Sequence, residues 1–261
     1  MEEKLLQMKS LVERLNQASD SYYNGKSELM TDYEWDALFD QLKRLEEETG
    51  EILPDSPTNR VSEDSIVGKK EEHEFAALSL AKTKQVSDLV KWAEDRPIWI
   101  SWKLDGLTLV VTYDGGKLTK IVTRGNGHIG TNITHLAPAI SGIPATISEK
   151  GHLVVRGEAV ISYADFEQFI IESEGDYANP RNLASGSLTL KDIEEVKQRH
   201  IQWIPFTLVY TERELTSWGE RMQMLKDLGM NPVERERIDH PTTENIQLEI
   251  DKFTEKVTSK K

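Results

Sequence analysis

The hydrophobic periodicity changes once along the chain, and this change divides the chain into two structural parts. Apolar residues first recur at helical spacing, at Leu5, Met8, Val12 and Leu15, as they do on one face of an amphipathic helix. From residue 98 onward they alternate with other residues, as in the run from Leu107 to Tyr113, which indicates strands with one buried face. We therefore expect an α+β protein, with a helical N-terminal unit followed by a largely antiparallel sheet.

The domain boundaries follow from start and stop signals. Thr31-Asp32-Tyr33-Glu34 has the capping-box pattern, so a second amphipathic helix is expected to begin there. Pro54 and Pro57 then end regular structure, and a polar stretch follows. These signals predict a helical unit at residues 1–50, a linker at 51–75 and a mixed domain at 76–261.

Within the mixed domain the pattern predicts a set of short strands and four helices. Asp114-Gly115-Gly116 is a hairpin turn signal between two of the strands. The expected strands cover residues 98–102, 107–113, 117–123, 153–161 and 201–210, and the expected helices cover residues 84–95, 163–173, 214–228 and 243–258.

Composition excludes several kinds of function. The 261 residues include 45 acidic and 32 basic ones, a net charge of −13, whereas duplex binding depends on Lys and Arg that neutralise phosphates. There is no cysteine, which excludes disulfides, thiolate metal sites and a cysteine nucleophile. The N-terminus lacks an apolar signal core, and no stretch reaches membrane-spanning length. A cytoplasmic protein without a membrane partner is expected.

One short motif carries nucleophilic chemistry. Lys103-Leu104-Asp105-Gly106 lies between two expected strands, where an amine is held rigidly and can attack phosphorus once it is deprotonated. Asp105 could orient the amine or hold a divalent cation, and Gly106 could let a phosphate approach the backbone. The plainer interpretation is an exposed lysine before a turn, because four residues with one free position recur by chance.

Further motifs stand in a fixed order around this lysine, and together they resemble the nucleotidyltransferase domain of bacterial NAD-dependent DNA ligases. The resemblance covers residues 5 to 258 and implies an ATP-grasp-like ligase fold. The motifs that carry it are Leu78-Ser79-Leu80, Thr123-Arg124-Gly125-Asn126-Gly127, Val155-Arg156-Gly157-Glu158, the run from Asn179 to Ser187, and, in the helical unit, Tyr22, Tyr23, Asp32, Trp35 and Asp36.

The resemblance implies a reaction and a role for each motif. Lys103 would take AMP from NAD with Mg²⁺ and expel nicotinamide mononucleotide (NMN), with Asp105 as the second catalytic residue. Glu158 would bind a ribose hydroxyl, and Phe206 would stack on adenine. The remaining nucleotide-binding positions would be Ser79, Leu80, Ser101, Arg124 and Arg181, the two arginines through phosphate or ribose oxygens. For each arginine a surface ion pair is the simpler alternative.

In the helical unit the resemblance implies recognition of NMN. Asp32 and Asp36 are four residues apart on a helix with Trp35 beside them, which offers two acceptors and an aromatic ring to a cationic nicotinamide. Tyr22 and Tyr23 complete this set. The alternative is that Asp32 favours the positive helix end while Trp35 joins the core.

The chain departs from the family pattern at four places. Ser101 stands where the family has Glu, Thr189 where it has an Arg that is important to nucleotide chemistry, Asn126 where Asp is usual and Tyr23 where His is frequent. The chain also ends at Lys261, before two motifs that supply lysines near the phosphates and before the family's DNA-binding, zinc and interaction modules. The pattern predicts an N-terminal ligase piece with reduced activity, which binds nicked duplex DNA weakly or not at all.

Three functions remain open on these grounds. The first is AMP transfer from NAD to Lys103, the opening step of nick sealing in DNA replication and repair. The second is a binding module for NAD or a partner that keeps the fold without the chemistry, which the loss of the arginine at Thr189 favours. The third is a nucleotidyltransferase acting on RNA or protein, which the NAD-type helical unit disfavours.

Overall fold

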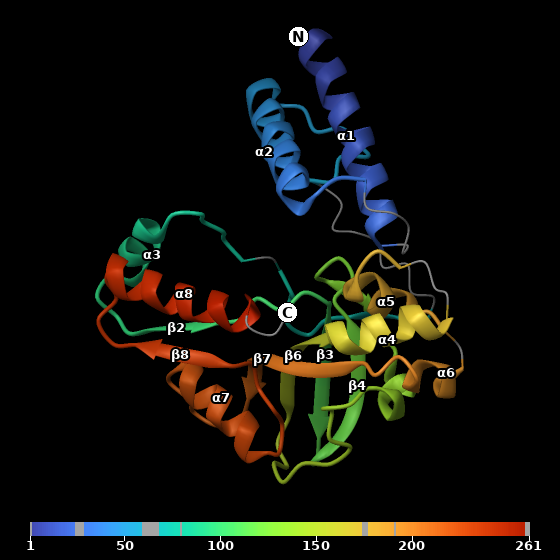
Figure 1. Cartoon of the computed structure of the whole chain (residues 1–261), viewed down its shortest axis with the longest axis vertical. Coiled ribbons are helices and arrows are strands. Elements are labelled where there is room, and N and C mark those ends of the chain that lie inside the picture. Colours follow the sequence, from blue (N-terminus) through green and yellow to red (C-terminus); the bar gives the residue numbers. More distant parts are fainter. Residues whose placement is uncertain are drawn as a thin grey trace.

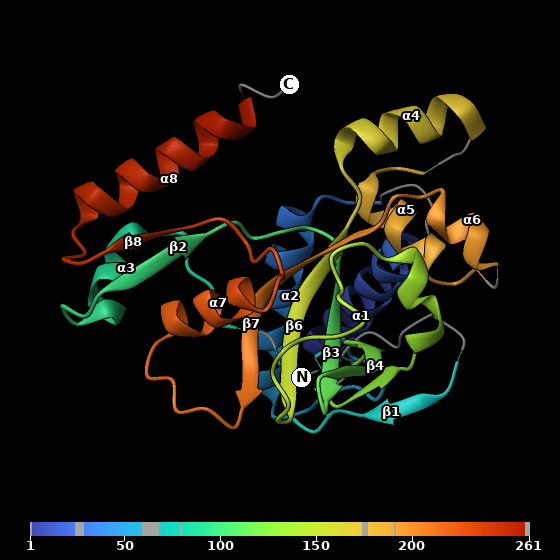
Figure 2. The same cartoon turned by 90° about the horizontal axis from the view of Figure 1, so that it is seen from below.

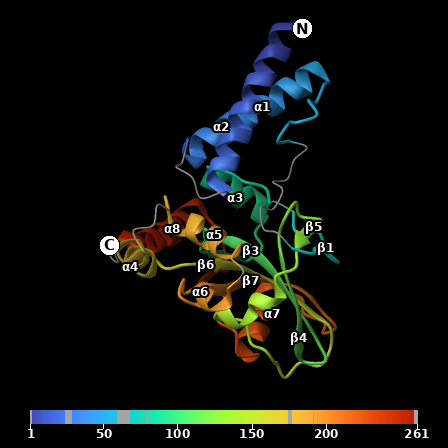
Figure 3. The same cartoon turned by 90° about the vertical axis from the view of Figure 1, so that its right-hand side faces the viewer.

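The N-terminal part of the chain is a pair of helices. The computed structural model describes residues 2–23, 29–58, 68–78, 80–173, 177–190 and 192–258. Helices α1 (Glu2–Tyr23) and α2 (Asp32–Thr49) lie side by side and project from one end of the sheet-containing part (Figures 1 and 3). Apolar side chains from both helices close a small core of their own, formed by Met8, Leu11, Val12, Leu15, Leu42 and Leu45.

Helix α2 begins where the sequence predicts. The Thr31 hydroxyl accepts a hydrogen bond from the Glu34 amide at 3.2 Å, and the Glu34 carboxylate accepts one from the Thr31 amide at 2.8 Å. The helix ends at Gly50, whose φ of 70° is left-handed and suits glycine. The predicted capping box is therefore confirmed.

The connection between the two parts is structured at both ends. Ser56 donates a buried 2.6 Å hydrogen bond to Glu46 of α2, so residues 51–58 belong to the helix pair. Strand β1 (Lys70–Glu72) pairs antiparallel with β5 (Ile129–Thr131), so residues 70–72 belong to the sheet-containing part. Residues 59–67 lie outside the described residues, and the exact domain boundaries stay a prediction.

A four-stranded antiparallel sheet in the order β4-β3-β6-β7 is the centre of the second part (Figures 1 and 2). Its strands are β3 (Leu107–Asp114), β4 (Lys117–Thr123), β6 (Leu153–Val160) and β7 (Gln202–Thr211). Strand β3 pairs with both β4 and β6, and β6 pairs with β7. The predicted α+β class and these four strands are confirmed, with small shifts at their ends.

The two faces of this sheet differ in chemistry. One face carries Leu109, Val111 and Tyr113 of β3 into the main apolar core, which also contains residues of the short helices η1 (Thr134–Ala139), α5 (Pro180–Ser187) and α6 (Ile193–Lys197) and of α7 (Trp218–Asp227). The opposite face carries Thr108, Val110 and Thr112. Val110 and Thr112 are also buried, so the strand is covered on both sides rather than on the one side that its alternation predicts.

A smaller layer lies beside the main sheet. Strand β2 (Ile98–Ser101) pairs antiparallel with β8 (Arg235–Ile238), and helices α3 (Val86–Ala93) and α8 (Thr243–Thr258) pack on this pair (Figure 2). Ala93, Ile98, Ile238 and Ile246 form its core. Helices in all four predicted ranges are confirmed, the last being α8 and another being α4 (Tyr163–Ser173). Among the described residues, none of the helices has the length and apolar character that crossing a bilayer requires.

The capping box gives a first prediction. Thr31→Ala removes the hydroxyl that accepts a hydrogen bond from the Glu34 amide. We expect this substitution to lower the free energy of unfolding by about 1 kcal/mol. Thr31→Ser keeps the hydroxyl and should stay close to the wild-type stability. Equilibrium urea unfolding followed by far-UV circular dichroism measures both values. An equal loss in the two variants would contradict a role for the hydroxyl.

Candidate active site

The predicted nucleophile lies in the loop at residues 102–106, which connects β2 to β3. Lys103 and Asp105 are exposed, whereas Gly106 is buried. The Gly106 amide donates a 3.1 Å hydrogen bond to Oε1 of Glu158 on β6. A side chain at Gly106 would place its Cβ 2.1 Å from the carbonyl oxygen of Ala159. The close approach of β6 therefore requires glycine at this position, and access for a phosphate stays a prediction.

Glu158 is the buried carboxylate of this site. Its side chain lies on the face of the sheet opposite the apolar core, because Glu158 pairs with Thr108 across β3 and β6. Oε2 accepts a 2.9 Å hydrogen bond from the Thr108 hydroxyl, and the residue is 8% exposed. Burial raises the pKa of the Glu158 carboxyl, an effect that the Thr108 hydroxyl and the positive charges of Arg181 and Lys103 oppose.

Asp105 has a cationic partner. Arg181 is the second residue of α5, a helix whose N-terminus is capped by the Asn179 side chain and begins with Pro180. The Arg181 guanidinium donates a 2.8 Å hydrogen bond to the Asp105 carboxylate, which is 57% exposed. Asp105 was expected to orient the lysine or hold a cation, and in this structure it contacts Arg181.

Two arginines bind the backbone of residues 75–77, which we call the crossing segment. This segment lies over the face of the sheet that carries Glu158. Arg124 donates from Nε to the Ala77 carbonyl at 2.9 Å, and Arg156 donates from Nη2 to the carbonyls of Ala76 at 2.7 Å and Phe75 at 3.2 Å. Arg124 was expected to contact phosphate or ribose, but here its Nε binds backbone. The segment leads to Leu80, which is 88% exposed, while Ser79 lies outside the described residues.

The remaining described positions are two predicted site residues, Ser101 and Phe206, and two departures from the family pattern, Asn126 and Thr189. Ser101 is exposed at the end of β2, and Phe206 is partly buried on β7. Asn126 stabilises its turn, since its side-chain oxygen accepts from the amides of His128 and Ile129. Thr189 is exposed just after α5, and its hydroxyl donates to the Gly186 carbonyl at 2.6 Å.

In the helix pair, Trp35 is partly buried between the helices. Its indole N–H lies 3.3 Å from the Leu15 carbonyl and 3.2 Å from the Ser19 hydroxyl, and its ring stacks on Phe39 at 4.8 Å. Trp35 thus joins the core, as the simpler alternative predicted. The side chains of Tyr22, Tyr23, Asp32 and Asp36 lie outside the described residues.

The fold gathers four of the predicted residues from three places in the sequence. Lys103 and Asp105 come from one loop, Glu158 from a strand and Arg181 from a helix N-terminus. Sequence reasoning missed two residues here. Thr108 donates a hydrogen bond to Glu158. Only the pairing of β3 with β6 could have pointed to it. Arg156 supports the crossing segment, although it belongs to a quoted motif.

The side chains around Lys103 offer few ligands for a metal ion. Among the described residues there is no group of three or more His, Asp or Glu side chains that could hold a metal ion. Asp105 lies two residues from Lys103, and the Glu158 carboxyl senses the charge of Lys103. Mg²⁺ keeps several waters and often needs only one or two carboxylates together with substrate phosphates. This site therefore fits Mg²⁺ only in the company of a phosphate ligand.

Comparison with known proteins confirms the resemblance in both parts. A family model described as NAD-dependent DNA ligase adenylation domain matches residues 69–260, and one described as DNA ligase-like, N-terminal NAD⁺-binding domain matches residues 1–62. A DNA ligase of Lachnoclostridium phytofermentans is 40% identical over 252 residues, which cover 94% of this chain and 38% of the relative. A DNA ligase of Ruminiclostridium cellulolyticum is 38% identical, covering 98% of this chain and 40% of the relative. The chain spans about two fifths of the length of these relatives.

The buried carboxyl gives a second prediction. An acid whose pKa is raised in the folded protein binds more protons in the folded chain than in the unfolded chain. The free energy of unfolding therefore falls as the pH rises above the pKa of the unfolded chain, which is about 4.5 for Glu158. Glu158→Gln keeps a hydrogen-bond acceptor without this charge. We expect the wild-type free energy of unfolding, relative to that of the variant, to fall from about pH 4.5 toward neutral pH. Parallel pH profiles in urea unfolding would contradict this assignment.

Proposed function

The chain belongs to the NAD-dependent DNA ligase family, and from this premise we propose that Lys103 accepts AMP from NAD. The observation that carries the proposal is the grouping of an exposed lysine, a buried carboxylate and an arginine–aspartate pair where the loop at residues 102–106 leads into the central strand β3. Such a grouping offers a nucleophile, a ribose acceptor and a cation for phosphate. Nick sealing in DNA replication and repair is the whole-protein activity that we propose this step serves, in the cytoplasm.

The proposed step is a displacement at phosphorus. The neutral Lys103 amine attacks the AMP phosphorus of NAD, so a phosphorus–nitrogen bond forms. The phosphoanhydride bond to the NMN phosphate breaks, and NMN leaves with the electron pair. The amine loses its proton to solvent. The product is AMP bound to Lys103 through a phosphoramide, and neither oxidant nor reductant is needed.

The surrounding residues have distinct proposed roles. Glu158 keeps unused lone pairs on both oxygens, so it can accept a ribose hydroxyl without losing its present partners. Arg181 can transfer one of its donors from Asp105 to a phosphate oxygen, since guanidinium binds both groups bidentately. Asp105 would then be released to a phosphate-bound Mg²⁺, which supplies charge neutralisation. The proposed nucleotide contacts also include Ser79, Leu80, Ser101, Arg124 and Phe206.

NMN recognition is proposed for the helix pair. The supporting observation is the match of residues 1–62 to an N-terminal NAD⁺-binding domain. Tyr22, Tyr23, Asp32 and Asp36 are the proposed contacts, with the Trp35 ring as the stacking surface. Binding the leaving group outside the adenylation domain explains why NAD would be the AMP donor rather than a triphosphate.

A catalytically impaired NAD-binding module is the second candidate. The observation that favours it is Thr189, an exposed hydroxyl where the family has an arginine. Removing one preorganised stabiliser of transition-state charge typically costs about 10²–10³ in rate, so we propose slow transfer. With a net charge of −13, this chain is also proposed to bind nicked duplex DNA weakly or not at all.

The third prediction concerns the covalent adduct. We expect intact mass spectrometry to show one AMP bound to the chain after incubation with NAD and Mg²⁺, and peptide mapping to place it on Lys103. Lys103→Arg keeps the charge but lacks a nucleophilic amine, so it should give no adduct. Thr189→Arg should raise the rate. No adduct in the wild type or in Thr189→Arg, with NAD binding intact, would favour the binding module.

The fourth prediction separates stacking from packing at Trp35. Stacking of a cationic ring is worth on the order of 0.5–2 kcal/mol, so Trp35→Ala should weaken NAD binding several-fold and leave AMP binding unchanged. Phe39→Ala is the matched control, because it removes the partner of the same 4.8 Å stack and not the proposed ligand surface. Isothermal titration calorimetry measures both ligands. Equal weakening of NAD binding in the two variants would assign Trp35 to packing alone.

A further inference from the structure

Trp102, the residue before the proposed nucleophile, is anchored outside the nucleotide site. Its indole N–H donates a 2.9 Å hydrogen bond to Oε2 of Glu234, in the segment before β8. Its ring also meets Phe253 of α8 edge to face, with centroids 4.7 Å apart at 74°. Trp102 therefore contacts two elements that lie more than 130 residues further along the chain.

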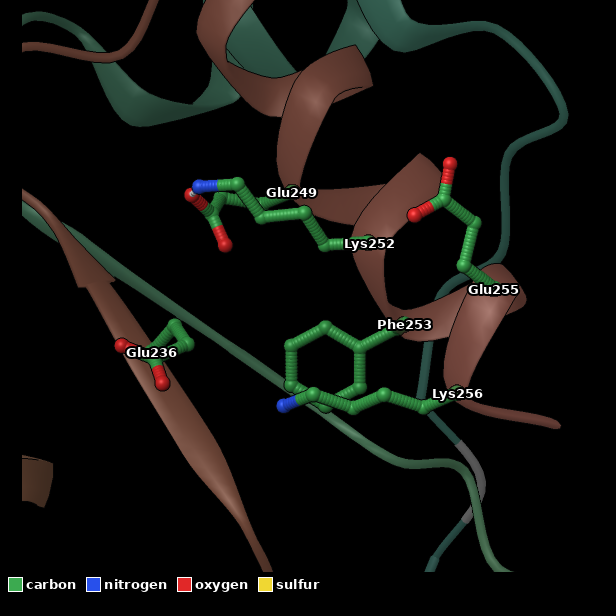
Figure 4. A pocket seen from close by; sticks show the side chains of 6 residues that line it. All are labelled: Glu236, Glu249, Lys252, Phe253, Glu255 and Lys256. Atoms are coloured by element: carbon green, nitrogen blue, oxygen red, sulfur yellow. Dashed lines mark hydrogen bonds and ion pairs between the residues drawn. The ribbon is translucent and has the colours of Figure 1, made fainter. Parts of the chain in front are cut away.

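Glu234 is itself fixed by the last turns of α8. Its Oε1 accepts a hydrogen bond from the Lys256 ammonium, and that ammonium lies 5.1 Å from the centre of the Phe253 ring. Figure 4 shows Phe253 and Lys256 together on α8, facing the strand that carries Glu236. These side chains border a groove of about 510 Å³ between β8 and α8, lined by Glu236, Glu249, Lys252, Phe253, Glu255 and Lys256.

The other end of the same loop is anchored separately. The Gly106 amide is bound to the buried Glu158, and β3 begins at the next residue. Lys103 thus lies on a short loop, residues 102–106, with one anchor at Trp102 and the other at Gly106. The Lys103 side chain is exposed, so its own packing does not fix the position of the amine. The loop backbone sets the point from which this flexible side chain extends.

We infer that Trp102, Glu234, Phe253 and Lys256 form a clamp that positions the Lys103 backbone for attack on phosphorus. These are positioning residues, since none of them touches the proposed reacting atoms. The kinetic part of the inference rests on the proposed function, and its structural part does not. A misplacement of about 1 Å in a reacting group can cost about 10²-fold in rate, so loosening one of two anchors should slow transfer about tenfold without changing NAD affinity.

The experiment compares matched variants of the whole chain. Glu234→Ala removes the acceptor for Trp102 and the partner of Lys256, whereas Glu234→Gln keeps an acceptor. Trp102→Phe keeps an aromatic ring beside Phe253 but loses the N–H together with one ring of the indole. Lys252→Met is the control, because Lys252 lies one turn before Lys256 on α8 and pairs with Glu249 at 2.5 Å instead of with Glu234 (Figure 4).

Two readouts are measured for each variant. Hydrogen–deuterium exchange of peptides spanning residues 98–106 reports the order of the loop and needs no activity. The rate of AMP attachment to Lys103, measured over a range of NAD concentrations, separates the maximal rate from the apparent KM. We expect Glu234→Ala and Trp102→Phe to raise exchange in the loop and lower the maximal rate at unchanged KM. Glu234→Gln should recover much of both, and Lys252→Met should match the wild type.

The outcomes separate the two proposals. Wild-type exchange in Glu234→Ala, or equal changes in Glu234→Ala and Lys252→Met, would overturn the clamp. A raised KM at an unchanged maximal rate would also overturn it, because it would make these residues nucleotide contacts. If the wild type itself forms no adduct, the proposed AMP transfer fails, while the exchange measurements still decide whether the loop is clamped.

Discussion

The site depends on one buried interaction, the bond between the Glu158 carboxylate and the Gly106 amide. This bond closes the loop that carries Lys103 onto strand β6, and it requires glycine because the Ala159 carbonyl occupies the space of a side chain. The antiparallel pairing of β3 with β6 places Thr108 where its hydroxyl supports the same carboxylate. Desolvation of a carboxylate disfavours its charge, so Glu158 is a buried acceptor whose charge a hydrogen-bond donor or a nearby cation stabilises. The main sheet thus has one face on the main apolar core and one that carries Glu158 and Thr108, where we propose that the nucleotide binds.

Much of the fold could be predicted from the sequence, because its long elements carry a clear periodicity. The capping box at Thr31, the strands of the main sheet and helix α8 all follow from spacing alone. The short elements could not be found this way. Strands β1 and β5 each have three residues and pair with partners far away in the chain, and β8 is set by its register with β2. Segments of this length carry too few residues for a periodic signal.

The candidate site shows the same division. Lys103, Asp105, Glu158 and Arg181 were identified from motifs, and the structure brings them together. What the motifs could not show is which partners these residues have within the protein. Arg124 holds the Ala77 carbonyl, Asp105 contacts Arg181 and Trp35 packs between helices. The support from Trp102 and Glu234 was also hidden, because it joins residues 132 positions apart and belongs to no recognised motif. Distant pairs of this kind become visible only in the folded chain.

We propose that a nucleotide binds on the face of the sheet that carries Glu158, between Lys103 and Glu158. The most direct measurement is a crystal structure of this chain soaked with AMP. We expect a ribose hydroxyl within hydrogen-bonding distance of the Glu158 carboxylate and the phosphorus within roughly 3–3.5 Å of the Lys103 amine, with the Gly106–Glu158 bond retained. AMP bound at another surface, or bound here with its ribose turned away from Glu158, would contradict it.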